Sequence, residues 1–120
     1  MFKGINVVSI PVPDLAAART FYSETLGLGE PLFDLPDDGW IEFSTGAPGS
    51  NLSITTAPDG WQPSDDTVCI VLNVEDTAAA VQDLTSRGIT CSEAATVEGM
   101  VTFASFHDPF GNKLQICSAA

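Results

Sequence analysis

Positive charge is scarce in this chain. Only four of its 120 residues are lysine or arginine and one is histidine, whereas sixteen are aspartate or glutamate, so the formal net charge at pH 7 is −12. This balance would repel a phosphate backbone, and nucleic acid is therefore not expected as a partner. A Gly-rich loop with the spacing that holds a phosphate group is also absent.

Long apolar runs and a disulfide framework are missing as well. No apolar stretch approaches the roughly 20 residues that a membrane-spanning helix needs, so we expect no membrane partner. Cys69, Cys91 and Cys117 are odd in number and lie in apolar or strand-like surroundings, which indicates free thiols in a reducing compartment. The first ten residues show no basic segment or cleavage site of a secretory signal, and the predicted location is the cytoplasm.

What the chain does contain is an internal repeat. Residues 12–18 (VPDLAAA) recur as residues 74–80 (VEDTAAA), a shift of 76 − 14 = 62, and the same shift carries residues 49–54 onto residues 111–116. Two copies kept in register indicate a paired-module fold within one domain, 1–120. We predict module one at about 1–57, a proline- and glycine-containing linker at about 58–66, and module two at about 67–120.

Module one is predicted to follow the order β-α-β-β-β. Residues 5–12 are rich in β-branched side chains, Asp14 is placed to cap a helix with an apolar stripe, and Gly27 is placed to end that helix. A loop or short strand is expected at residues 31–38, and strands are expected at 39–44 and 52–56.

Module two repeats that order. We expect a strand at residues 68–74, a helix capped by Asp76 and ended by Gly88, an extended segment at 89–91, and strands at 100–106 and 113–117 joined by a turn at 108–111. The fold class is therefore α+β. Each helix would cover one face of a mixed sheet and leave the other face free to line a groove.

Acidic and aromatic residues are interleaved in the middle of the chain. Half of the sixteen acids fall between residues 30 and 66, together with Phe33, Trp40 and Trp61. A cationic, planar ligand would be attracted by the charges and by the ring faces. The acidic loops of any soluble protein would give a similar composition, so both interpretations stay open.

Two segments carry a resemblance to a known superfamily. Residues 12–28 (VPDLAAARTFYSETLGL) and residues 108–115 (DPFGNKLQ) resemble the vicinal oxygen chelate superfamily, which includes glyoxalase I, extradiol dioxygenases, fosfomycin-resistance enzymes and bleomycin-resistance proteins. The resemblance covers nearly the whole chain. It implies two βαβββ modules that enclose a groove, and a homodimer in which chains complete their grooves by pairing or exchanging modules. It does not imply one activity, because this scaffold serves many chemistries.

The resemblance also implies where a metal would be held. In metal-dependent members the first and last strands of each module supply the ligands, commonly His or Gln on the first strands and Glu or His on the last. Mapped by distance from the capping Asp and the turn Gly, these positions hold Val7, Ser53, Cys69 and Gln115. Valine donates no electron pair, serine and glutamine are neutral, and a buried thiol resists deprotonation, so we expect no metal and no other cofactor.

Other catalytic arrangements have little support in the sequence. His107 is the only histidine, and we expect it at a strand end, bonded to backbone or water, because its neighbour Asp108 is suited to start a turn. Cys69 is expected to be a small buried residue, since no base or cation stands beside it. Ser53 and Gln115 interrupt apolar alternation and should point away from the helix-covered core. There they either contact a ligand or bond to each other or to water.

Two functions follow from these observations. In the first, a metal-free protein binds a small organic molecule, aromatic or cationic, in the groove between the modules, as antibiotic-sequestering members do. In the second, the chain is a glyoxalase-like lyase or isomerase, a transferase or a dioxygenase-related enzyme that acts on a small substrate through Ser53, Cys69 or Gln115; a regulatory or accessory domain is a third alternative. Alternate strand residues share a face, so the expected binding residues are Val7, Ser9, Ser53, Cys69, Val71 and Gln115, with Phe33, Trp40 and Trp61.

Overall fold

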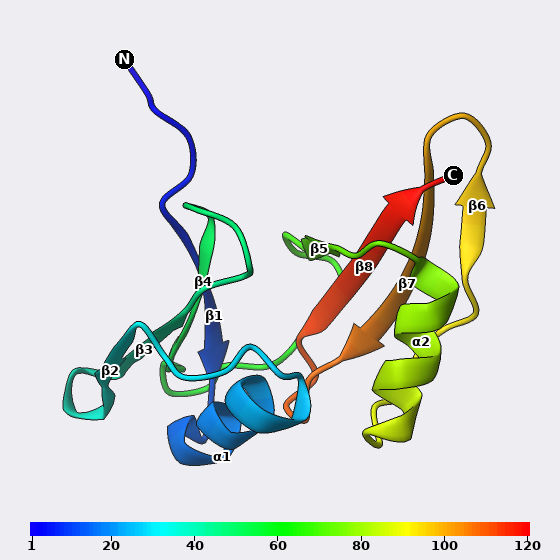
Figure 1. The fold of residues 1–120 in the computed structure, drawn as a ribbon. Coiled ribbons are helices and arrows are strands. Elements are labelled where there is room, and N and C mark those ends of the chain that lie inside the picture. Colours follow the sequence, from blue (N-terminus) through cyan, green and yellow to red (C-terminus); the bar gives the residue numbers. More distant parts are fainter. The chain divides into compact units, whose positions relative to one another are not determined.

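The computed structural model describes residues 1–120, and the chain divides into two compact units, Met1–Gln62 and Pro63–Ala120. Each unit contains one four-stranded mixed sheet and one α-helix in the order β-α-β-β-β (Figure 1). The predicted α+β class with two βαβββ modules is therefore confirmed. None of the helices has the length and apolar character that a membrane span requires.

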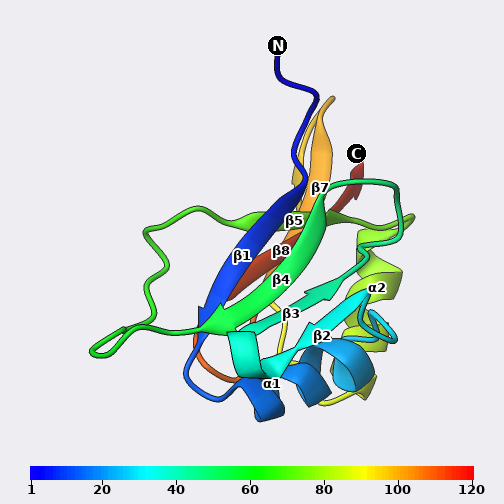
Figure 2. The same cartoon turned by 90° about the vertical axis from the view of Figure 1, so that its left-hand side faces the viewer.

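The first unit is built around parallel strands β1 and β4. Its elements are β1 (Val7–Val12), α1 (Leu15–Thr20), a π-helical continuation (Phe21–Thr25), β2 (Phe33–Leu35), a 3-10 turn (Pro36–Asp38), β3 (Trp40–Phe43) and β4 (Asn51–Thr56). The strand order is β1-β4-β3-β2, with β1 parallel to β4 and the other pairs antiparallel. Figure 2 shows this sheet with β1 and β4 side by side and α1 below them.

The second unit repeats this arrangement. It contains β5 (Ile70–Asn73), α2 (Thr77–Ser86), β6 (Ala95–Val97), β7 (Val101–His107) and β8 (Lys113–Ala119), in the sheet order β5-β8-β7-β6. Strand β5 is parallel to β8, and α2 packs against β7 and β8.

Both helices begin and end where the sequence predicts. The carboxylate of Asp14 accepts a hydrogen bond from the Ala17 N–H at 3.0 Å, and that of Asp76 accepts one from the Ala79 N–H at 3.2 Å. These bonds satisfy backbone donors that the first turn of a helix leaves free. Gly27 and Gly88 follow the helices with φ angles of 89° and 84°, a conformation that favours glycine.

The strand that follows α2 differs from the prediction. Residues 89–91 do not form a strand; Cys91 makes a single isolated bridge with Phe106, and the strand lies later, at β6. The neighbouring Ser92 explains the break, because its hydroxyl accepts the hydrogen bond from the Ser105 N–H at 2.8 Å. A backbone carbonyl would accept that bond in a continuous ladder.

The register of the two sheets reproduces the repeat in the sequence. Ser9 pairs with Ser53 in the first sheet, and Val71 pairs with Gln115 in the second. Since 71 − 9 = 62 and 115 − 53 = 62, residues separated by the repeat distance occupy equivalent places in their own sheets. The predicted equivalence of these positions therefore holds at the level of individual strand pairs.

Candidate ligand-binding face

One face of the first sheet is apolar and carries the core. Ile10, Ile41 and Ile54 lie at mutually paired positions and are 7%, 1% and 0% exposed. Helix α1 packs against β4, the strand that contributes Ile54. Side chains alternate between the two faces of a strand, so the residues between these isoleucines point to the opposite side. We call this side the open face; its residues are Val7, Ser9, Pro11, Phe33, Leu35, Trp40, Glu42, Asn51, Ser53 and Thr55.

Two hydroxyl groups meet at the centre of the open face. The Ser9 and Ser53 Oγ atoms lie 2.7 Å apart, within a hydrogen bond in which either can be the donor. Ser53 is 0% exposed, whereas Ser9 is exposed. The alternation places Ser53 away from the helix-facing core, as predicted, and its hydroxyl bonds to Ser9.

A buried carboxylate lies beside this pair, and the sequence analysis did not single it out. Glu42 pairs with Ser53 across β3 and β4 and is only 6% exposed. The Trp40 Nε1–H donates to its Oε1 at 3.1 Å, and the Asn51 Nδ2 group donates to its Oε2 at 2.8 Å. The alternation of side chains along residues 39–44 could have identified Glu42, because it puts Trp40 and Glu42 on one face of the strand.

An apolar edge adjoins the carboxylate on the same face. Phe33 pairs with Glu42, and Leu35 pairs with Trp40, so the side chains of the edge strand β2 lie next to the polar centre. Phe33 is 54% exposed and Leu35 is 47% exposed. Trp61 lies outside the sheet, in a turn where its backbone N–H donates to the Pro58 carbonyl at 3.1 Å.

A hollow of about 480 Å³ borders the open face. Its lining residues are Leu32, Ser44, Gly46, Ala47, Pro48, Gly49 and Asn51. Asn51 lines this hollow and also donates to Glu42, so the hollow and the buried carboxylate are neighbours.

The second sheet has an equivalent face, on which Ser105 pairs with Gln115 as Glu42 pairs with Ser53 in the first sheet. Gln115 pairs with Val71, and its Nε2 group donates to the Ser105 Oγ at 3.1 Å. The Cys69 thiol lies 3.7 Å from the Lys113 carbonyl oxygen. Burial raises the pKa of Cys69, and Asp65 raises it further, although Lys113 opposes the shift. The thiol therefore resists ionisation, although Cys69 is half-buried and not fully buried as predicted.

The partner of His107 differs from the prediction. Its Nε2 atom lies 2.8 Å from a carboxylate oxygen of Asp65, not against backbone or water. This arrangement does not make a Cys-His pair, because His107 and Cys69 flank Lys113 on opposite sides of β8. Two strand spacings separate them by about 9–10 Å. Asp108 starts a turn as predicted, with its Oδ1 accepting the N–H groups of Phe110 and Asn112 at 2.9 Å.

The residues at the metal positions implied by the resemblance do not fit a divalent ion. Val7 offers no donor atom, and the Ser53 hydroxyl already bonds to Ser9. Cys69 favours the protonated state, which leaves the neutral amide of Gln115. No group of three or more His, Cys, Asp or Glu side chains in the chain is arranged to hold a metal. Divalent metal sites need several such ligands.

The predicted binding residues fall into two sets. Val7, Ser9 and Ser53 share one face of the first sheet, joined there by Phe33 and Trp40. Val71 and Gln115 are paired in the second sheet, and Cys69 directly precedes β5. That the two sets line one groove stays a prediction.

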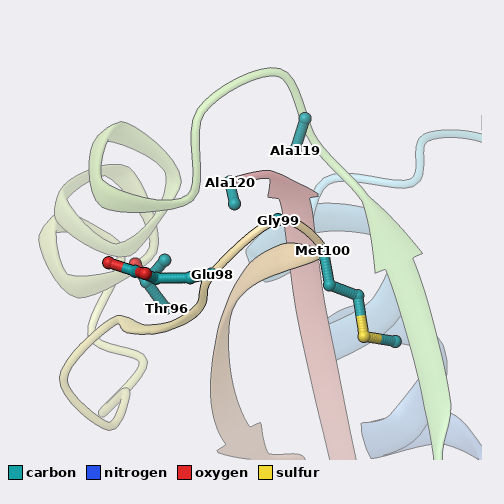
Figure 3. Close-up of a pocket in the computed structure, with 6 residues that line it drawn as sticks. All are labelled: Thr96, Glu98, Gly99, Met100, Ala119 and Ala120. Carbon is teal, nitrogen blue, oxygen red and sulfur yellow. The ribbon is translucent and has the colours of Figure 1, made fainter.

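A second hollow, of about 510 Å³, lies at the end of the second unit where the β6–β7 turn meets the end of β8 (Figure 3). Its lining residues are Thr96, Glu98, Gly99, Met100, Ala119 and Ala120. The side chains of Glu98 and Met100 point away from each other in Figure 3, so they do not converge on one position. The open face of the first sheet is the better candidate.

Comparisons with known proteins agree with this fold. The model of the Glyoxalase/Bleomycin resistance protein/Dioxygenase superfamily matches residues 4–116. A glyoxylase-like domain-containing protein from Didymella fabae is 30% identical over 127 aligned residues, which cover 95% of this chain and 92% of that protein.

Solved structures show the same architecture. TnmS3, an antibiotic binding protein from Streptomyces sp. CB03234, aligns with a TM-score of 0.83 and 23% identity, over 99% of this chain and 98% of that one. A superfamily member from Sphaerobacter thermophilus DSM 20745 aligns with a TM-score of 0.79 and 23% identity, over 98% of both chains. At these identities the likeness concerns the fold.

Proposed function

Since the chain belongs to the glyoxalase/bleomycin resistance protein/dioxygenase superfamily, we propose that it binds a small organic molecule and needs no metal to do so. The observation that carries this proposal is the open face of the first sheet. There the hydrogen-bonded pair of Ser9 and Ser53 and the buried Glu42 carboxylate lie next to exposed apolar side chains. A few fixed polar groups among apolar and aromatic walls are typical of ligand sites.

The side chains at the superfamily's metal positions support the proposal that binding needs no metal. The metal positions implied by the superfamily hold one apolar residue, two neutral polar residues and a thiol whose pKa is raised by burial. A divalent ion there would lack compensating charge. Binding through the sheet's own polar and aromatic groups needs no such ion.

The character of the ligand is proposed from charge and aromatic content. The net charge of −12 attracts cations, and Trp40 and Phe33 offer ring surface on the open face. The fold of TnmS3, which is described as an antibiotic binding protein, supports a role in which holding a compound is itself the function. We extend the binding surface to Cys69, Val71 and Gln115 of the second sheet, and we expect a cytoplasmic homodimer.

Catalysis on a small substrate is the less supported alternative. Cys69 has a raised pKa, and no base lies at hydrogen-bond distance from it. The Ser53 hydroxyl bonds only to another hydroxyl, and Gln115 is neutral. A serine or cysteine nucleophile needs a base that is hydrogen-bonded to it or a lowered pKa, and Ser53 and Cys69 have neither.

A thermal-denaturation screen of small organic compounds, run in the presence of EDTA, tests the proposal. Hits should bind with one site per chain by calorimetry, and mass spectrometry should recover the bound compound unchanged. Phe33→Ala should weaken binding, whereas Phe2→Ala, which removes an equally apolar side chain that is 89% exposed, should not. Binding that appears only when a divalent metal is added, or a change in the mass of the compound, would contradict the proposal.

A further inference from the structure

Glu42 is a buried carboxylate without a cationic partner in its own unit. It is 6% exposed, and its hydrogen bonds come from the neutral side chains of Trp40 and Asn51. The side chains that bond to carboxylates elsewhere in the chain contact other acids: Arg19 forms an ion pair with Asp34, Arg87 forms one with Asp83, and the His107 ring bonds to Asp65.

Lys3, the other cationic side chain of the first unit besides Arg19, does not supply the missing charge. It lies in the exposed segment before β1 and forms no ion pair with Glu42. Burying a carboxylate without an opposite charge is unfavourable, and two neutral hydrogen bonds offset only part of that cost.

Glu42 also keeps unused capacity to accept hydrogen bonds. An ionised carboxylate can accept about four hydrogen bonds, and Trp40 and Asn51 provide one to each oxygen. A group that completes this shell must donate hydrogen bonds and carry positive charge. An ammonium group does both, and hydrogen bonds between ions are stronger than those between neutral groups.

From this geometry we infer that Glu42 anchors the ligand and that the ligand carries a protonated amine. The inference rests on the proposed function and specifies its ligand class: a primary or secondary ammonium attached to an apolar or aromatic body. The ammonium would bond to Glu42. The body would lie against Phe33 and Leu35, which pair with Glu42 and Trp40 on the adjacent strand. The exposed hydroxyl of Ser9 offers one more hydrogen bond.

A purely structural role for Glu42 makes a different prediction. In that role the carboxylate only fixes Trp40 and Asn51, and an isosteric amide would serve nearly as well. The Gln side chain keeps an oxygen that accepts from Trp40, and the Asn51 amide can turn its own oxygen toward the new NH₂ group. Glu42→Gln should therefore fold normally in either case, and only ligand selectivity separates the two roles.

The test uses benzylammonium as the probe and benzyl alcohol as its uncharged analogue. Trp40 donates directly to Glu42, so its indole Nε1–H proton NMR signal reports on the site. The chain has two tryptophans, and Trp61→Phe identifies the signal of Trp40. Both probes are titrated to millimolar concentrations at pH 7 and constant ionic strength. We expect a saturable shift with benzylammonium and at least about tenfold weaker binding of benzyl alcohol.

Three variants test whether Glu42 is responsible for the selectivity. Glu42→Gln should reduce the affinity for benzylammonium to that for benzyl alcohol, whereas Asp37→Asn should keep the preference. Asp37 is exposed and in the same unit, so this control removes the same charge without touching the open face. Glu42→Asp keeps the carboxylate but moves it back by one methylene group. This variant should bind benzylammonium more weakly and still prefer it to benzyl alcohol. Glu42→Asp keeps the test usable if Glu42→Gln does not fold.

Several results would overturn the inference. They are equal affinity for both probes, no shift of the Trp40 signal with either probe, or a preference for benzylammonium that survives Glu42→Gln. Neutral compounds that bind with one site per chain in the screen, without dependence on Glu42, would leave the proposed function standing and remove only this inference. A complete lack of hits in that screen would count against both.

Discussion

The Ser9 and Ser53 hydroxyl groups form a 2.7 Å hydrogen bond between parallel strands, at positions paired in register. One member is exposed and the other is fully buried. The pair therefore joins a buried and an exposed position of the open face, and Glu42 adjoins it from the next strand. Disturbing either hydroxyl should have effects that differ in size and can be measured.

Loss of the exposed serine should destabilise the protein more than loss of the buried one. Ser9→Ala leaves the Ser53 hydroxyl buried without a partner, which costs about 1–3 kcal/mol. Ser53→Ala leaves the Ser9 hydroxyl free to bond to water, and the expected cost is about 0.5–1.5 kcal/mol. Urea denaturation of both variants measures this difference. The reverse order would show that the Ser53 hydroxyl finds another partner.

Gly111 should be sensitive to substitution for two separate reasons. Its φ angle is 94°, and a Cβ atom there would lie 2.8 Å from the Pro63 Cβ. Gly88 has a similar φ of 84° but open space around it. Gly88→Ala should cost about 1–2 kcal/mol from backbone strain alone, and Gly111→Ala should cost more. Thermal denaturation provides the comparison.

A second substitution separates the two contributions at Gly111. Pro63→Gly removes both side-chain atoms that the new methyl group would meet. In that background the cost of Gly111→Ala should fall toward that of Gly88→Ala. An unchanged cost would mean that the contact with Pro63 is not responsible.

Cys69 and Cys91 should react slowly with thiol reagents at neutral pH. Burial raises the pKa of both thiols, and at Cys69 the opposing effect of Lys113 does not reverse this shift. At each pH, alkylation by iodoacetamide should be slower than for an ordinary thiol, and its rate should keep rising with pH beyond the ordinary thiol pKa of 9.0. Mass spectrometry of digested protein reports the rate at each residue, and urea-unfolded protein is the control. Fast reaction of Cys69 at pH 7 would revive a role as nucleophile.

The same pKa shifts predict how stability depends on pH. When the folded protein holds a thiol proton more tightly than the unfolded chain does, the stabilisation is complete below the unfolded pKa. It is lost as the pH rises through the folded pKa. The melting temperature should therefore fall above about pH 9, and the double variant Cys69→Ala, Cys91→Ala should show a shallower fall. A fall of equal steepness in both proteins would assign the effect to other groups.

Features encoded by neighbouring residues were predictable from the sequence. The caps at Asp14 and Asp76 need only a side chain three residues from its N–H partner, and both form as expected. The repeat of 62 residues placed Ser53 and Gln115 at equivalent positions because strand register preserves sequence spacing. Alternation along the strands then predicted which way Ser53 points.

Features that depend on distant partners could not be read in this way. The carboxylate that bonds to His107 lies 42 residues away in Asp65, and no local pattern relates the two. The alternation around Glu42 was visible, but its burial depends on Asn51 from the next strand. The position of β6 was missed because the Ser92 hydroxyl, and not a backbone carbonyl, accepts the hydrogen bond from the Ser105 N–H. The segment at residues 89–91 resembles a strand in its sequence alone.

The central claim is that this member of the superfamily works without the superfamily's metal. Elemental analysis of untagged protein tests it most directly, first as purified without chelator and then after incubation with zinc, nickel, manganese and iron followed by desalting. We predict that no metal is retained near one per chain, because Val7, Ser53, Cys69 and Gln115 supply too little charge and too few free donors. Retention of one metal per chain, lost on Gln115→Ala, would contradict the account and make glyoxalase or dioxygenase chemistry the leading function.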